Sequence, residues 1–185
     1  MAKKDKTKWN KKYQNNPIPN QAIQLVQTYA KYAKGTKALD IACGMGRHSK
    51  YLASIGFNVD ALDISSVAIQ SLQNIECINT IEVDFDTYVL KEETYDLIVC
   101  TFFLKRSLFP QIIKALKSDG ILIYETFVHH SENQQIPSNK SFLLEKGELE
   151  ENFKTPFLKL YSKEYWDSTM KGYKMRKASL VVQKI

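Results

Sequence analysis

The stretch ALDIACGMGRHSKYLASIGFNVDALDIS, residues 38–65, decides the fold. It opens with a short apolar run, residues 37–42, that predicts a buried strand. A glycine-containing turn follows, and residues 47–55 then carry apolar side chains at helical spacing. A second apolar run, residues 57–63, predicts a second strand. Strand, tight turn, helix and strand in this order indicate the start of a parallel α/β sheet.

Two glycines and an acid in this stretch indicate a nucleoside site. Gly44 and Gly46 allow unusual backbone dihedrals and let a ligand lie against bare backbone. Asp63 ends the second strand, where an acid in this type of fold can accept both hydroxyls of a ribose. The alternative is that Asp63 only caps the helix that follows. A GxG pattern alone is a weak signal, so neighbouring residues must decide the class of nucleotide.

Two neighbouring residues favour S-adenosyl-L-methionine over NAD. The third glycine of the dinucleotide fingerprint is absent, and Ser49 stands in its place. Asp40 directly precedes the turn, where a carboxylate about 5 Å from a pyrophosphate would cost roughly 3 kcal/mol at an effective dielectric near 20. S-adenosyl-L-methionine has no phosphate, and its ammonium and sulfonium groups are attracted by an acid. An unpaired buried carboxylate is expensive, so Asp40 is hard to explain by structure alone.

The remaining chain continues the alternation of helix and strand. It predicts an α/β fold with a doubly wound, mostly parallel sheet that ends in an antiparallel pair. We expect Asn20 to cap the first helix and Ser65 or Ser66 to cap a later one, Pro110 to lie in a first helical turn, and residues 118–120 to form a turn. The further expected strands are 78–83, 95–103, 121–127, 157–165 and 173–184, with a short helix at 145–153 and a polar loop at 128–141.

Length and composition fit one domain, residues 1–185, of a reduced, cytoplasmic protein. The three cysteines are odd in number, are widely spaced and form no CxxC pair, which argues against disulfides and a zinc site. No apolar stretch is long enough to cross a bilayer, and the start lacks the apolar core of a secretory signal. The net charge is +6, and much of the positive charge lies in the first twelve residues. Residues 1–19 are therefore interpreted as a basic tail or as a lid.

Ordered motifs carry a resemblance to a known family. DIACGMG, Asp63, Asp84-Phe85, YDLIVC and LKSDGILI resemble the motifs of class I S-adenosyl-L-methionine-dependent methyltransferases over about residues 9–185. GRHS, FFLKRSLFP, ILIYETF and FLLEKGELEENF are similar to the small bacterial tellurite-resistance (TehB-like) group. The resemblance implies a Rossmann-like seven-stranded sheet of order 3-2-1-4-5-7-6. It also implies that the segment with Trp9, Tyr13 and Pro17 folds over the cofactor; the alternative is a disordered tail with two anchoring aromatics.

The resemblance also implies roles for individual residues on the cofactor side. Asp40 and the backbone of 42–46 would hold the methionine end, and Asp63 would bind the ribose. Asp84, rather than Asp86, would accept from the adenine amino group. Phe102 or Phe103 could stabilise the sulfonium through its ring face, although core packing is the simpler interpretation. The expected cofactor-binding residues are Asp40, Ala42, Gly44, Gly46, Asp63, Ile64, Asp84, Phe85, Thr101 and Phe102.

On the acceptor side, polar residues follow the fourth and fifth expected strands. Arg106, Glu125 and His129 lie beyond strand ends, where open α/β sheets bind ligands. Glu125 or His129 could serve as a general base if the acceptor needs one. His129 and His130 have no matching ligands nearby, so no metal site is expected. For His48, core packing is the alternative to a role in the site.

The predicted reaction is methyl transfer from S-adenosyl-L-methionine to a small-molecule acceptor, with S-adenosyl-L-homocysteine as product. The protein is expected to act as a monomer or homodimer. Alignment of the reactants and exclusion of water would supply most of the rate, on the order of 7–11 kcal/mol. A nucleic-acid or protein methyltransferase that uses the basic tail is the second hypothesis. It is less favoured, because Thr101 to Lys105 contains no Asn/Asp-Pro-Pro-Tyr-type loop to grip a flipped base. The third is a non-catalytic module that binds the cofactor.

Overall fold

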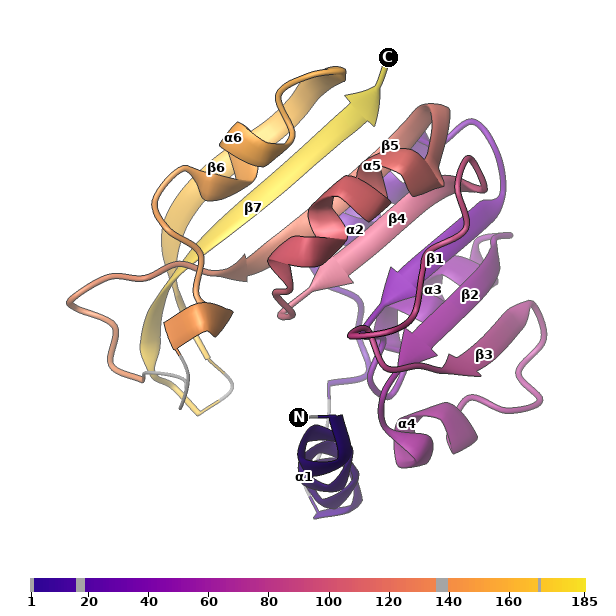
Figure 1. The fold of residues 1–185 in the computed structure, drawn as a ribbon, viewed down its shortest axis with the longest axis horizontal. Coiled ribbons are helices and arrows are strands. Elements are labelled where there is room, and N and C mark those ends of the chain that lie inside the picture. Colours follow the sequence, from indigo (N-terminus) through magenta and orange to yellow (C-terminus); the bar gives the residue numbers. More distant parts are fainter. Residues whose placement is uncertain (1, 16–18, 136–139, 170) are drawn as a thin grey trace.

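The computed structural model describes residues 2–15, 19–135, 140–169 and 171–185. One seven-stranded sheet runs through the molecule in the order β3-β2-β1-β4-β5-β7-β6 (Figure 1). The neighbours from β3 to β5 are parallel, whereas β5–β7 and β7–β6 are antiparallel. The predicted fold class and strand order are therefore confirmed. The strands are β1 (Lys37–Ile41), β2 (Asn58–Asp63), β3 (Ile78–Glu82), β4 (Tyr95–Thr101), β5 (Leu116–Phe127), β6 (Phe157–Ser168) and β7 (Lys174–Lys184).

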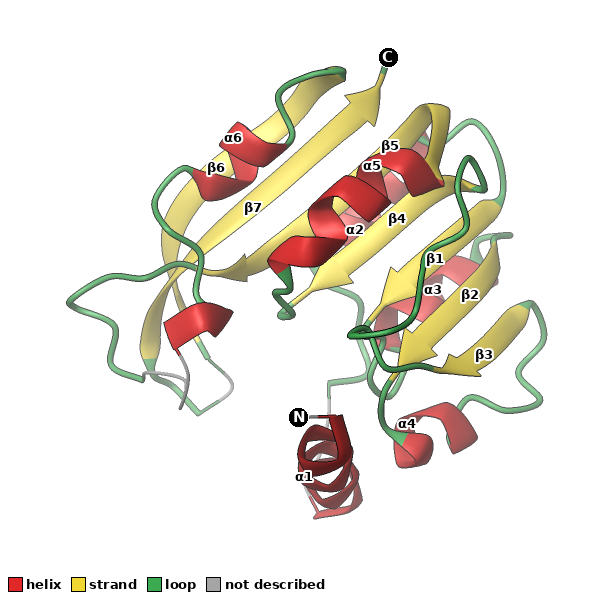
Figure 2. Cartoon of the chain, in the orientation of Figure 1, coloured by secondary structure: helices red, strands yellow, loops and turns green. Residues whose placement is uncertain are grey.

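Helices cover both faces of the sheet, as a doubly wound topology requires. In Figure 2, α5 and α6 lie in front of the sheet, and α2 and α3 lie behind it. Alternate side chains of one strand serve the two layers: Leu97 and Val99 pack with the α2 and α3 side, whereas Ile98 packs with the α5 and α6 side. The helices are α1 (Ala2–Asn15), α2 (Gln24–Tyr29), α3 (Arg47–Ser54), α4 (Ser66–Gln70), α5 (Phe109–Ala115) and α6 (Glu148–Asn152), with the 3-10 turns η1 (Ala30–Tyr32), η2 (Arg106–Leu108) and η3 (Lys140–Phe142).

Three local expectations differ from the structure. The first expected helix begins only at Gln24, with Ile23 rather than Asn20 as its N-cap, and the His48 ring accepts the Ile23 N–H at 3.5 Å instead. Residues 118–120, expected as a turn, lie within the long strand β5 at a register shift against β4. Residues 2–15 form a helix rather than an irregular tail.

The N-terminal helix lies beyond the carboxyl ends of the parallel strands (Figure 1). It is detached from the two layers that cover the sheet, and it contacts α4. This edge of the sheet is the one at which open α/β folds bind their ligands. Within the described residues, no helix has the length and apolar character needed to cross a membrane. The fold therefore places a basic helix next to the expected binding edge.

Candidate functional site

The glycine turn has the backbone geometry that the sequence predicts. Ala42, Gly44 and Gly46 all have positive φ values, of 54°, 55° and 72°. A Cβ atom on Gly46 would lie 2.4 Å from the Leu72 side chain, and one on Gly44 would lie 2.9 Å from the Tyr13 hydroxyl. Both positions thus require glycine for space as well as for conformation.

Asp63 at the end of β2 is buried and faces this turn. Its Oδ2 accepts the Gly44 N–H at 2.8 Å, and its Oδ1 accepts the Ser65 N–H at 2.8 Å. Burial raises the pKa of the Asp63 carboxyl, and the backbone hydrogen bonds oppose that rise. Each carboxylate oxygen can accept a second hydrogen bond. Asp63 thus fixes the turn and retains acceptor capacity for a diol.

Asp40 at β1 is buried beside the same turn. Ser49 Oγ donates to Asp40 Oδ2 at 2.6 Å, so the residue at the missing third glycine holds this carboxyl in place. Burial raises the pKa of Asp40 to about 7, against hydrogen bonds from Ser49 and the charge of Arg47, which lower it. A buried carboxyl whose hydrogen-bond donors both belong to Ser49 is suited to a cationic ligand.

Helix α1 reaches this site through two side chains. Asn10 Oδ1 accepts from Ser65 Oγ at 2.6 Å, and its Nδ2 donates to Ser66 Oγ at 3.0 Å, at the start of α4. The Tyr13 hydroxyl packs against Gly44, and burial together with the charge of Asp63 raises the pKa of Tyr13. Lys6 forms an ion pair with Glu82 at the end of β3. The contact residue Asn10 was not singled out from the sequence, because a polar residue in a lysine-rich segment carries no visible signal.

Four further residues that the sequence predicts to bind the cofactor lie at the same edge of the sheet. Asp84 Oδ1 accepts the Asp86 N–H at 2.9 Å, and Asp86 pairs with Lys105. Phe85 is buried in the core, with its ring 5.3 Å from that of Phe103. The other two, Ile64 and Thr101, are partly exposed beyond β2 and at the end of β4.

His48 belongs to the layer beneath the site. Its Nδ1 lies 3.4 Å from Thr101 Oγ1, and its Nε2 accepts from the Ile23 N–H. Burial lowers the pKa of His48 to about 3, with a further contribution from Arg47. The ring is therefore neutral near pH 7 and links α2 and α3 to the end of β4.

Phe102 follows β4 in a left-handed conformation, with φ of 55°. Two cations lie over its ring: the Arg47 guanidinium at 5.1 Å and the Lys177 ammonium at 4.8 Å from the centroid. The ring of Phe127 lies 5.5 Å away. The end of β4 thus carries an aromatic ring flanked by positive charge, an arrangement that cation–π attraction stabilises.

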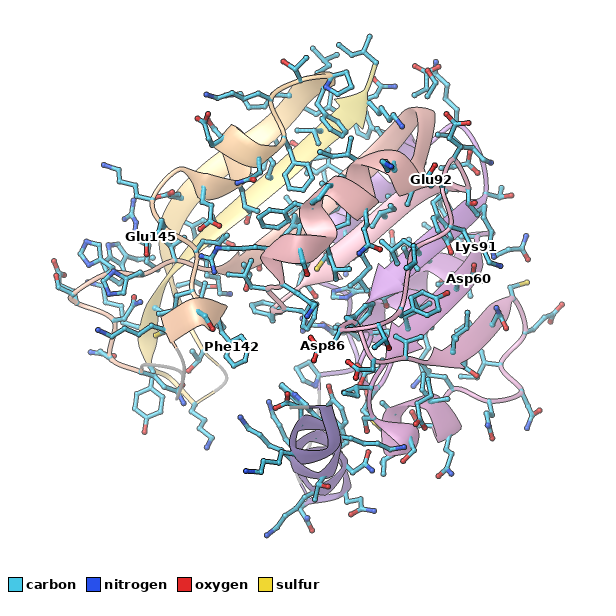
Figure 3. All side chains as sticks on the ribbon, viewed as in Figure 1. Asp60, Asp86, Lys91, Glu92, Phe142 and Glu145 are labelled. Carbon is cyan, nitrogen blue, oxygen red and sulfur yellow. The ribbon has the colours of Figure 1, made fainter. Side chains whose placement is uncertain are left out.

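The three residues expected on the acceptor side, Arg106, Glu125 and His129, lie in different surroundings. Arg106 holds residues 140–148: it forms a two-pronged ion pair with Glu148 at 2.6 and 2.8 Å and donates to the Ser141 and Leu143 carbonyls. His129 is exposed on the loop after β5. Phe142 projects from η3 on the side of the molecule on which Asp86 also lies (Figure 3). Of the three candidates, Glu125 is the buried one.

Glu125 belongs to a buried polar network between three strands. Its Oε2 accepts from Ser179 Oγ at 2.6 Å and from Tyr165 Oη at 2.9 Å, and its Oε1 lies 3.8 Å from Lys177 Nζ. Sequence reasoning missed Lys177 and Ser179. The available signal was their alternation with apolar residues, which puts both on one face of β7. In the described part of the chain, no group of three or more His, Cys, Asp or Glu side chains is arranged for a metal ion.

Comparisons with known proteins relate the chain to one family. The family model described as "Tellurite resistance protein TehB" matches residues 1–169. A "Probable S-adenosyl-L-methionine-dependent methyltransferase TehB" of Haemophilus influenzae is 29% identical over 156 residues, which are 79% of this chain and 53% of that protein. The chain thus spans about half the length of this curated relative. The crystal structure of TehB from Haemophilus influenzae superposes with a TM-score of 0.75 at 25% identity, over 97% of this chain and 67% of that one.

A second relative, matched over a shorter stretch, has a macromolecular substrate in its name. The "Ribosomal protein L11 methyltransferase" of Campylobacter concisus is 33% identical over 122 residues, which are 62% of this chain and 43% of that protein. The matched part of both relatives includes no more than about half of their length. The likeness therefore extends to only part of each relative.

Proposed function

The chain belongs to the TehB family of S-adenosyl-L-methionine-dependent methyltransferases, and we propose that it transfers the cofactor's methyl group to a small-molecule acceptor by in-line displacement. The observation that carries this proposal is the pair of buried acids, Asp40 and Asp63, on either side of a turn whose two glycines bring bare backbone to the site. Such a site fits a nucleoside that bears positive charge and no phosphate. When bound, S-adenosyl-L-methionine supplies a methyl group on a cationic sulfur that is already an activated leaving group.

The residues of the chain would bind the cofactor and align its methyl group with the acceptor. Asp40 and the 42–46 backbone would hold the methionine end, and Asp63 the ribose. Ile64, Asp84 and Phe85 would line the adenine side, and Thr101 with Phe102 would lie beside the methyl. The acceptor would enter between this edge and residues 140–148. Alignment and water exclusion would supply most of the acceleration, and no residue is assigned as a general base.

Residues 1–19 would form a lid within a single domain, 1–185. The contacts of Asn10 and Tyr13 support this, since they join α1 to the start of α4 and to the glycine turn. Pro17 lies outside the described residues. A lid at this position would limit water entry and set the rate of product release.

We expect Asn10→Ala to speed the release of S-adenosyl-L-homocysteine by roughly tenfold, because two hydrogen bonds that hold α1 closed contribute about 0.5–1.5 kcal/mol each. Stopped-flow displacement of the bound product measures this rate. Gln14→Ala, on an exposed position of the same helix, is the matched control. Equal release rates in the wild type and Asn10→Ala would exclude the lid.

The acceptor is the second part of the proposal. The family's description makes chalcogen oxyanions the first class to test, followed by thiols and small carboxylates. We expect S-adenosyl-L-homocysteine to form with at least one of these classes and not with RNA, DNA or ribosomal protein. The assay is product formation by mass spectrometry across the panel. Cofactor binding without product from any acceptor would instead support a non-catalytic module.

The second candidate function is methylation of a nucleic acid or protein. The observation in its favour is the exposed face of α1 with Lys4, Lys8 and Lys11, together with the relative that carries a ribosomal protein in its name. Binding to RNA that weakens steeply with salt would favour it. The three free cysteines support a reducing, cytoplasmic location, and the protein would act as a monomer or homodimer.

A further inference from the structure

Lys177 is a buried charged residue of strand β7. Its side chain is only 8% exposed, and its neighbours Met175, Ala178 and Leu180 are core residues. Burial of an ammonium group is costly unless it is paired or used. The structure therefore needs a reason for a lysine at this position of β7.

Two carboxylates hold the ammonium at the end of the sheet. Lys177 Nζ donates to Asp167 Oδ2 at 2.7 Å and lies 3.8 Å from Glu125 Oε1. Glu125 is itself fixed by the hydroxyl groups of Tyr165 and Ser179. The position of the cation is thus set by a network that spans β5, β6 and β7.

The network places the ammonium over the ring of Phe102, which the proposed function puts beside the transferable methyl. Lys177 pairs in register with Phe127, and its Nζ lies 4.8 Å from the centre of the Phe102 ring. The Phe102 N–H donates to the Glu125 carbonyl, which joins the ends of β4 and β5. The acids that suit the cofactor are on β1 and β2, and the cations Arg47 and Lys177 converge on Phe102. Each of these cations also faces acids: the charge of Arg47 acts on Asp40, and Lys177 lies between Asp167 and Glu125.

We propose that Lys177 is the acceptor-binding cation, which selects acceptors that carry negative charge; this rests on the proposed function. The hydrogen bond to Asp167 uses one of three ammonium N–H groups, so donors remain for an acceptor oxygen. Asp167 is 46% exposed, and solvent therefore screens its charge more than that of the buried Lys177. Anion binding next to a low-dielectric wall is strengthened by a fixed positive charge.

Titration of tellurite into the complex of the enzyme with S-adenosyl-L-homocysteine tests this by calorimetry. We expect Lys177→Met to weaken tellurite binding roughly tenfold or more, since a charge-assisted hydrogen bond is lost. Lys163→Met removes the same charge from an exposed position on β6 and is the matched control, with affinity expected within about twofold of wild type. Equal affinities for Lys177→Met and Lys163→Met, or no tellurite binding by the wild-type complex, would overturn the proposal.

A second variant separates this role from a structural one. Asp167→Asn removes the exposed partner of Lys177, so we expect tighter tellurite binding, by roughly threefold or more. Misfolding would weaken binding in every variant and could not produce this increase; unchanged or weaker binding by a folded Asp167→Asn variant contradicts the proposal. Binding of S-adenosyl-L-homocysteine is measured first in the same cell. If the wild type does not bind S-adenosyl-L-homocysteine, the proposed function is refuted. If it binds S-adenosyl-L-homocysteine but not tellurite, only the role of Lys177 is refuted.

Discussion

Asp63→Ala is expected to weaken the binding of S-adenosyl-L-homocysteine by roughly a hundredfold or more. Hydrogen bonds to a charged group contribute about 1.5–3 kcal/mol each, and a ribose offers two hydroxyls to this carboxylate. Each 1.4 kcal/mol corresponds to about tenfold in affinity. Isothermal titration calorimetry of the wild type and the variant measures the difference directly.

The variant also removes a structural partner, so stability must be measured in parallel. Asp63 accepts the N–H groups of Gly44 and Ser65, and unpaired buried donors cost about 1–3 kcal/mol each. Asp60→Asn is the matched control, because Asp60 is a buried acid on the same strand, bonded to Lys37, Asn79 and Tyr95 instead (Figure 3). We expect it to lower the thermal midpoint and leave the affinity within about twofold. Equal affinities for wild type and Asp63→Ala would remove the ribose assignment.

Asp40→Asn is expected to abolish a pH dependence of cofactor binding. Burial raises the pKa of Asp40 from 3.8 to about 7 in the free protein, and the cofactor's ammonium favours the ionised form. Wild-type affinity should therefore fall by up to about tenfold per pH unit below pH 7 and level off above it, with proton release on binding at the lower pH. Calorimetry at pH 6, 7 and 8 in buffers of different ionisation enthalpy measures both effects.

The same shift predicts an opposite effect on stability. Between about pH 4 and pH 7, Asp40 ionises in the unfolded chain but not in the folded one, so its contribution to the free energy of unfolding declines as pH rises and is constant above pH 7. An asparagine can still accept from Ser49 and carries no buried charge. Free Asp40→Asn should thus gain stability relative to the wild type from pH 5 to pH 8, as followed by urea unfolding.

Other ionisable groups near Asp40 must be considered when the pH dependence of the wild type is compared with that of Asp40→Asn. Asp63 also has a raised pKa, while Tyr13 remains protonated and Arg47 charged across this range. His48, with a pKa near 3, does not titrate above pH 5. A pH slope that persists in Asp40→Asn would assign the dependence to Asp63 instead.

The order of elements could be predicted because the information is local. The apolar run before Asp40, the glycine turn and the acid at Asp63 follow one another within 26 residues (38–63), and strand and helix periods are visible over such lengths. The antiparallel end of the sheet was visible in the alternation of residues 177–182. The ends of the helices were harder to predict. Asn20 is a residue type that caps helices, but the helix begins later, after Ile23, whose N–H donates to His48, 25 positions away.

The sequence by itself determined the succession of strands and helices and the acids that face the glycine turn, because each of these depends on residues close together in the chain. The sheet order followed from the resemblance of the motifs to a known family. Only the tertiary structure decided that the lysine-rich start is a helix docked through Asn10 and Tyr13, and that Arg106 holds a loop. It also brought Lys177 to Glu125 and Phe102, which lie more than 50 positions earlier in the chain. Such contacts depend on register and strand order, and no periodicity within a single segment encodes them.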